Sequence, residues 1–171
     1  MGVNLRAATV CGWSPRTRLD LTVNIFAANA YANGVVRVHG GQQKRPNVVI
    51  NDLVRAYLLL LSAPKELVQG ESFNVVASNH NVLEIARRVA DAVRPDCKIV
   101  VEPVLDRRSY HVTAAKIAER LGFRCRLRIE DGARQISNAI RDTRIGDPSA
   151  SEYFNLRHLV EIGAVRKLGP S

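Results

Sequence analysis

Short apolar segments of strand length alternate with segments of helical periodicity along the first half of the chain. The strand-like segments are residues 5–10, 35–38 and 48–50, and the helical segments are residues 20–33 and 52–63. Pro64 ends the second of these helices because proline cannot continue one. Strands that alternate with helices favour parallel pairing, so the sequence predicts an α/β fold in which helices cover a layered sheet.

The second half of the chain is more helical and predicts a smaller lobe. Strand-like segments at residues 73–76 and 98–101 flank a helix predicted over residues 82–93, and Asn79, His80 and Asn81 form a capping-type cluster before it. Further helices are predicted from Thr113 to Gly122, over residues 129–140 and, more weakly, over residues 152–167. Gln42 to Arg45 is expected to be a polar loop.

Composition argues against several classes of protein. The three cysteines lie far apart, which suggests neither a disulfide framework nor a zinc site and favours a reducing compartment. No apolar run approaches the ~20 residues of a membrane helix, and no signal sequence is evident, so we expect a cytoplasmic protein without membrane contact. The net charge of +9 is spread over small separate groups, so nucleic-acid binding is a less favoured alternative.

The sequence contains no recognisable catalytic or cofactor-binding motif. A glycine-rich turn of the Gly-x-Gly-x-x-Gly type, which lets a helix N-terminus approach a pyrophosphate, is not found. None of the four tyrosines is followed four residues later by a lysine that would lower the pKa of its phenol. We therefore predict no catalytic, cofactor-binding or metal-binding residue in this sequence.

Two arginines are candidates for a binding role. Arg45 follows Lys44 and precedes Pro46, which favours an extended backbone, and its guanidinium could pair with a diphosphate. Arg108 lies in the polar segment Asp106-Arg107-Arg108-Ser109-Tyr110-His111, between a strand and a helix. Arg45 could equally be a solvated loop charge, and Asp106 could simply pair with one of the arginines of its segment. Residue types alone leave these alternatives open.

Several ordered motifs resemble those of the extended short-chain dehydrogenase/reductases, the NAD-dependent epimerase/dehydratase family. Residues 5–12 resemble the family's "LRxxxVYG" strand, with Cys11 in place of an aromatic residue. Residues 40–53 resemble its "G-x-x-x-R-x-x-x-H-V-x-D" segment, with Val49 where His is common. Phe73-Asn74-Val75 resembles the "FNv" strand, and residues 108–123 resemble a late block that ends in Leu-Gly-Phe. The resemblance extends to about Arg141.

The resemblance implies a fold, a ligand class and site residues. The expected fold has the last strands of a Rossmann-type parallel sheet with covering helices in residues 1–80, a small α/β substrate-binding lobe in residues 81–150 and a helical tail in residues 151–171. Family members use NAD(P) to act on nucleoside-diphosphate sugars. The resemblance implies that Arg45 and Arg108 contact the diphosphate, and that Asp20 and Asn24 begin a helix lining the sugar-nucleotide cleft.

The family's cofactor loop and Tyr/Lys pair should lie upstream of Leu5, where only four residues are found. We therefore expect the chain to be inactive alone. It is a truncated product, or it is completed by a separate polypeptide that supplies the N-terminal half, or it is a non-catalytic binding or interaction module. Exposure of a strand edge would also permit a homo-oligomer.

Overall fold

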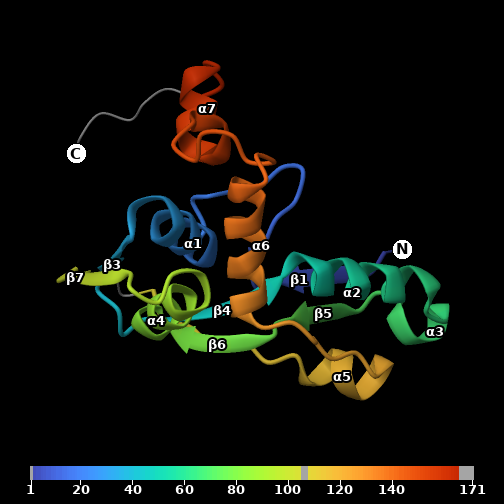
Figure 1. The fold of residues 1–171 in the computed structure, drawn as a ribbon. Coiled ribbons are helices and arrows are strands. Elements are labelled where there is room, and N and C mark those ends of the chain that lie inside the picture. The colour runs from blue at the N-terminus through green and yellow to red at the C-terminus, as the bar shows by residue number, and fades with distance from the viewer. Residues whose placement is uncertain (1, 105–107, 166–171) are drawn as a thin grey trace.

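The computed structural model describes residues 2–104 and 108–165, and it confirms the predicted α/β fold with parallel strand pairs. β1 (Asn4–Ala7) pairs in parallel with β5 (Ser72–Val75), and β3 (Val35–His39) pairs in parallel with β7 (Lys98–Glu102). β2 (Thr9–Cys11) is parallel to β4 (Lys44–Val49), which is antiparallel to β6 (Ser78–Asn81). The strands thus form three small sheets (Figure 1).

The helices cover these sheets in two groups. α1 (Thr22–Asn33), α4 (Val82–Val93) and α6 (Ile129–Arg141) pack against one another. α1 and α4 lie next to β3, and α6 lies next to β2 and β4. α2 (Ile50–Ser62), the short α3 (Lys65–Val68) and α5 (Ala115–Leu121) lie near β1 and β5 (Figure 1). Among the residues that the structure describes, no helix is long and apolar enough to cross a membrane.

The strand predicted over residues 5–10 is two strands in different sheets. Ala8 separates them, and its N–H donates to the carbonyl of Val75 at 3.0 Å. The chain then leaves β5 and pairs with β4 instead. The prediction of one strand was wrong because apolar composition reports burial but not the partner to which each residue bonds.

The predicted loop ending at Arg45 was also wrong. β4 already begins at Lys44, and Arg45 lies opposite His80 in the antiparallel ladder with β6. Hydrogen bonding to β6 thus extends a strand through residues whose polarity is typical of a loop. Asn81 nevertheless caps α4 as expected, since its side chain accepts from the N–H of Glu84 at 2.7 Å.

The first hydrophobic core lies between α1, α4 and α6. Each helix contributes small and branched apolar residues that are fully buried; they include Val23, Ala27, Ala30, Ile85, Ala86, Val89, Ala133 and Ile136. Gly132 permits the closest approach, because a Cβ there would lie 2.8 Å from the sulfur of Cys11. Alanine and glycine therefore let these helices pack tightly onto the strand ends below them.

The second core lies between α2, the β1–β5 pair and α5. Leu53, Ala56 and Leu60 point from α2 toward the buried Phe73 and Val75 of β5. Asp52 joins the two halves of the molecule: its fully buried carboxylate accepts from the N–H groups of Arg126 and Leu127, both at 2.8 Å. These residues lead directly into α6.

The C-terminal segment is shorter than predicted. The predicted helix over residues 152–167 is a 3-10 turn at Ser151–Tyr153 followed by α7 (Asn155–Glu161), and its last two residues lie outside the described part. The helix ends because Gly163 adopts a left-handed φ of 71°. The N–H of Leu19 donates to the carbonyl of Tyr153 at 2.8 Å, which attaches this segment to the body.

Candidate functional site

A pocket of about 470 Å³ opens beyond the carboxyl end of β3, beside the first turns of α1 and α4. Its apolar wall comes from Ile25, Phe26 and Val82. Its polar wall consists of Asp20, Thr22, Arg37, His39, Gln43, Arg45, Arg108 and Tyr110. The pocket thus combines an apolar surface with a cluster of arginines.

Three of the four residues singled out from the sequence line this pocket. Asp20, Arg45 and Arg108 come from separate parts of the chain and meet there. Asn24 does not line it and is only 2% exposed. Its side-chain oxygen Oδ1 accepts from the N–H of Gly12 at 2.9 Å, and its side-chain Nδ2 donates to the backbone carbonyl of Arg18 at 2.8 Å. Asn24 therefore fixes the loop before α1, whereas the ligand-binding roles of all four remain predictions.

Arg45 holds the segment that follows β7 against β4. Its Nη1 donates to the carbonyls of Arg108 and Lys44, the latter at 2.9 Å, and its guanidinium carbon lies 5.9 Å from the centre of the Tyr110 ring. The N–H of Lys44 donates to Ser109 Oγ at 3.0 Å. These contacts bring Arg108 and Tyr110 to the pocket. Asp106 and Arg107, noted in the same sequence segment, lie outside the described residues.

Arg37 and His39 also line the pocket and were missed in the sequence. Both are on β3, and both contact Glu102 of β7: Arg37 Nη1 at 3.0 Å and His39 Nδ1 at 3.1 Å. The alternation of buried and exposed residues in Val35–His39 was the available signal, because it places residues 37 and 39 on one face of the strand.

Gln43 organises the turn that closes one side of the pocket. Its Oε1 accepts from the N–H of Gly41 at 2.6 Å, and its Nε2 donates to the carbonyl of His39 at 2.8 Å. Gly40 has a φ of 76°, and a Cβ there would meet the carbonyl of Val104 at 2.9 Å. This glycine pair therefore makes a tight turn between two strands and does not begin a helix.

The electrostatics of the pocket favour an anion. Burial acts to raise the pKa of Asp20. The hydrogen bonds and positive charge of Arg18, together with a hydrogen bond from the backbone N–H of Asn155, outweigh burial and lower this pKa below its usual value. Asp20 is thus a carboxylate already paired with Arg18, at 2.9 Å. Arg45 and Arg108 add two positive charges, and Arg37 adds a third that is paired with Glu102. The first turns of α1 and α4 contribute partial positive charge as well.

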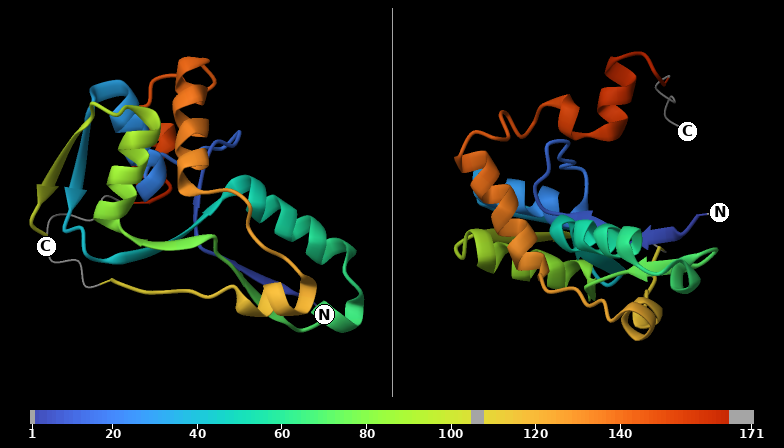
Figure 2. Two further views of the ribbon diagram at one scale, coloured as in Figure 1. Left: turned by 60° about the horizontal axis from the view of Figure 1, so that its bottom comes forward. Right: turned by 90° about the vertical axis from the view of Figure 1, so that its right-hand side faces the viewer.

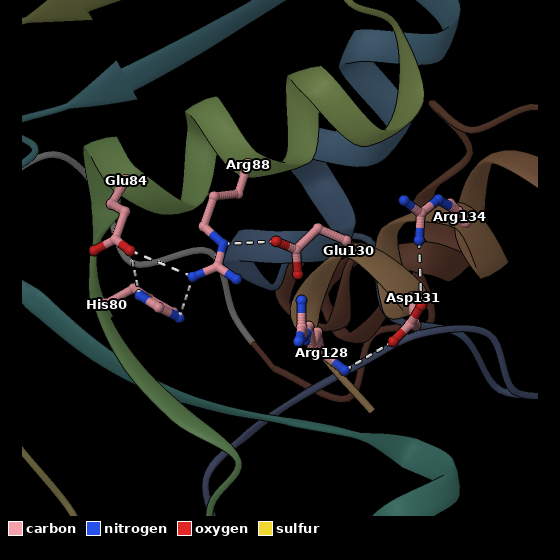
Figure 3. Close-up of polar contacts among 7 residues, drawn as sticks. All are labelled: His80, Glu84, Arg88, Arg128, Glu130, Asp131 and Arg134. Atoms are coloured by element: carbon pink, nitrogen blue, oxygen red, sulfur yellow. Dashed lines mark hydrogen bonds and ion pairs between the residues drawn. The ribbon is translucent and has the colours of Figure 1, made fainter. Parts of the chain in front are cut away.

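A second polar cluster lies between β6, α4 and α6 (Figure 3). Arg88 Nε donates to Glu130 Oε1 at 2.7 Å, and Arg88 Nη1 lies 3.0 Å from His80 Nε2, while His80 Nδ1 lies 2.6 Å from Glu84. The bond to Glu130 is the main cause of the raised pKa of Arg88. The cluster ties α4 to α6. Across the described residues, no group of three or more His, Cys, Asp or Glu could hold a metal ion.

The cysteines are poor nucleophiles. Burial raises the pKa of Cys11 to about 12, and burial together with the charge of Asp52 raises the pKa of Cys125 to about 11. Both thiols are therefore protonated at neutral pH, and protonated thiols do not attack substrates. The chemistry that the described residues support best is the binding of an anion.

Residues 1–76 match the model of the NAD dependent epimerase/dehydratase family. This match confirms the family resemblance inferred from the sequence motifs in that part of the chain.

Solved structures share the fold. A UDP-glucose 4-epimerase with UDP-glucose from Thermotoga maritima is 25% identical, with a TM-score of 0.65 over 82% of this chain and 46% of that one. A UDP-glucuronic acid 4-epimerase from Bacillus cereus, in complex with UDP-glucuronic acid and NAD, is 19% identical, with a TM-score of 0.68 over 82% and 45%. An L-threonine dehydrogenase from Phytophthora infestans is 13% identical, with a TM-score of 0.67 over 81% and 48%. The chain thus spans about half the length of these structures.

Proposed function

We propose that this chain, whose first 76 residues match the epimerase/dehydratase family, binds the diphosphate of a nucleoside-diphosphate sugar in the pocket beyond β3. Arg45 and Arg108 would pair with the phosphate oxygens, since a guanidinium offers parallel N–H donors to such oxygens. Phe26, Ile25 and Val82 would contact the less polar faces of the base or sugar.

The observation that carries this proposal is the convergence of three separate segments. Residues 20, 45 and 108 lie far apart in the sequence, and all three line one pocket. Two further features support an anionic ligand: Arg37 adds a third guanidinium, and two helices of twelve residues begin beside the pocket. The UDP-glucose present in the Thermotoga maritima structure makes this ligand class the natural first choice.

For the redox part of the reaction, we propose that NAD(P) and the catalytic tyrosine and lysine are supplied from outside these residues, so that the chain alone is inactive. The glycine turn at Gly40-Gly41 joins β3 to β4 and opens no helix, so it does not suit a dinucleotide pyrophosphate. No tyrosine in the sequence has a lysine four positions later.

An exposed apolar stripe on α2 supports a further protein contact. An exposed set of residues follows helical spacing beside the buried face formed by Leu53, Ala56 and Leu60, namely Val54, Tyr57, Leu58 and Leu61. Leu61 is 83% exposed. Within the described residues, β1 pairs only with β5, so its other edge remains open. We propose that this surface receives the dinucleotide-binding part.

Calorimetric titration with UDP-glucose, UDP and UMP tests the binding proposal. We expect UDP to bind about as well as UDP-glucose and UMP to bind more weakly, because the second phosphate supplies the charge. Arg45→Ala and Arg108→Ala should each weaken UDP binding by roughly ten- to a hundred-fold, the cost of a lost charge-assisted contact. Arg87→Ala, which removes an exposed arginine of α4 outside the pocket lining, is the matched control.

Equal affinities for UDP and UMP, or unchanged binding in both pocket variants, would refute the diphosphate site. The nucleic-acid alternative makes a different prediction: retention on DNA or RNA would fall steeply with salt, and nucleotide sugars would not compete it away.

A further inference from the structure

β7 is an exposed edge strand with an apolar centre. It lies at the margin of the molecule, with β3 on its inner side (Figure 2). Within residues 2–104 and 108–165, no other strand pairs with it. Its sequence is Lys-Ile-Val-Val-Glu, and Val100 and Val101 are 39% and 48% exposed. Edge strands of this kind commonly carry charges at their centre that prevent further pairing, whereas here the charges stand at the two ends.

The backbone of β7 leaves defined hydrogen-bonding groups open. The N–H of Lys98 donates to Gly34, and the carbonyl of Glu102 accepts from Gly40, both at 2.9 Å. Since successive residues of a strand direct their N–H and C=O groups to alternate edges, Lys98, Val100 and Glu102 face β3. Ile99 and Val101 therefore direct both of their backbone groups outward.

The pattern is complementary to itself. If a second β7 pairs antiparallel about a twofold axis at Val100, then Ile99 of each copy lies opposite Val101 of the other. These are the residues with outward N–H and C=O groups, so each pair exchanges two hydrogen bonds. The same register sets Lys98 opposite Glu102 of the second copy, so that Glu102 contacts Lys98 in addition to Arg37 and His39 of its own chain. Cross-strand pairs of opposite charge and of β-branched residues both stabilise a sheet.

We infer that β7 is a homodimer interface, in which two copies of this chain join their β3–β7 pairs into a four-stranded sheet with β7 next to β7. The occupant of the edge is thus a second copy of the same chain, and the register is centred on Val100. The surface is distinct from the α2 stripe, so dimerisation does not depend on whether a dinucleotide-binding part is present.

Sedimentation velocity of the whole chain over a range of concentrations tests the inference. We expect a monomer–dimer equilibrium whose dissociation constant rises at least about tenfold in Val100→Lys, because two like charges then face each other across the axis. Val104→Lys is the matched control, since Val104 is 50% exposed and lies just beyond the strand. It should dimerise like the natural chain.

A charge exchange tests the register. Lys98→Glu and Glu102→Lys should each dimerise poorly alone and should form a heterodimer when mixed, because only the mixture restores both opposite-charge pairs. Circular dichroism of each variant verifies that it is folded.

A Val100→Cys variant can detect the dimer by disulfide cross-linking even if the two copies associate weakly. Non-hydrogen-bonded partners lie close enough for a disulfide, so mild oxidation should link this variant above the level of the natural chain and of Val104→Cys. A chain that stays monomeric and whose Val100→Cys variant does not link, or a dimer lost in Leu61→Lys but kept in Val100→Lys, would overturn the assignment.

Discussion

The helices α4 and α2 are both rich in aliphatic residues, yet the structure covers them differently. α4 presents one apolar face, and the buried Ile85, Ala86 and Val89 fill it against α1 and α6. α2 has two apolar faces: one packs against β5, and the other carries Tyr57, Leu58 and Leu61 exposed on the surface. A helix that is apolar on most of its circumference is normally covered on more than one side. The difference indicates that the helical core around α4 is fully covered within the chain, whereas the outer face of α2 is built for an additional contact.

The largest expected effect lies in the covered core around α4. Ile85→Ala should lower the free energy of unfolding by about 3 kcal/mol, because Ile85 is fully buried and the tight packing of three helices prevents collapse of the cavity. Urea unfolding monitored by circular dichroism measures this change. Leu58→Ala on the exposed face of α2 should change the same quantity by less than about 0.5 kcal/mol. Similar losses at both positions would contradict the comparison.

A somewhat smaller effect is expected where the two regions join. Asp52→Ala should lower the free energy of unfolding by about 2–3 kcal/mol, since it leaves the N–H groups of Arg126 and Leu127 and the guanidinium of Arg55 without their carboxylate. Hydrogen exchange should show the strongest loss of protection around residues 123–128. A loss confined to α2 would show instead that the carboxylate serves only its own helix.

The polar cluster of Figure 3 should contribute about 1 kcal/mol to the free energy of unfolding at neutral pH. Burial acts to raise the pKa of Glu130, but the hydrogen bond and charge from Arg88 lower it overall. A carboxyl group whose pKa is lower in the folded state stabilises the protein above its unfolded pKa, and this stabilisation is lost as the pH falls through the folded value.

Glu130→Gln should therefore be less stable than the natural chain at neutral pH, and the difference should shrink in acid. Urea unfolding at neutral pH and in acid measures this difference in the free energy of unfolding. Asp91→Asn, at an exposed position of α4 outside this cluster, is the control and should show no comparable pH dependence. A constant difference across this range would show that the ion pair between α4 and α6 contributes nothing.

The smallest effect on stability is expected on the open face of α2. Leu61→Ser should leave the free energy of unfolding within about 0.5 kcal/mol of the natural value, because the side chain is 83% exposed. If a dinucleotide-binding domain docks there, the same substitution should weaken its capture at least about tenfold in a pull-down with purified components. Unchanged capture would place the contact elsewhere, and a large loss of stability would show that the stripe already packs within the chain.

Much of the fold could be predicted from local patterns. The helix over Val82–Val93 and the left-handed end of α5 at Gly122 followed directly from apolar spacing and glycine chemistry. The division of residues 5–10 between two sheets did not, because pairing partners are remote in sequence. The helix predicted from Thr113 begins at Ala115 with Ala114 at its N-cap position, although Thr113 Oγ1 accepts from the N–H of Ala115 at 3.2 Å.

The sequence by itself determined the α/β class, the family resemblance and the two arginines proposed to contact a diphosphate, because residue periodicity and ordered motifs are properties of the chain alone. Only the tertiary structure decided which polar residues meet. It placed Asp20, Arg45 and Arg108 around one pocket, added Arg37 and His39, and buried Asn24 as a support for the backbone. A pocket depends on where strands end and loops cross. Those positions are set by hydrogen-bond register and packing between distant segments, which no local pattern records.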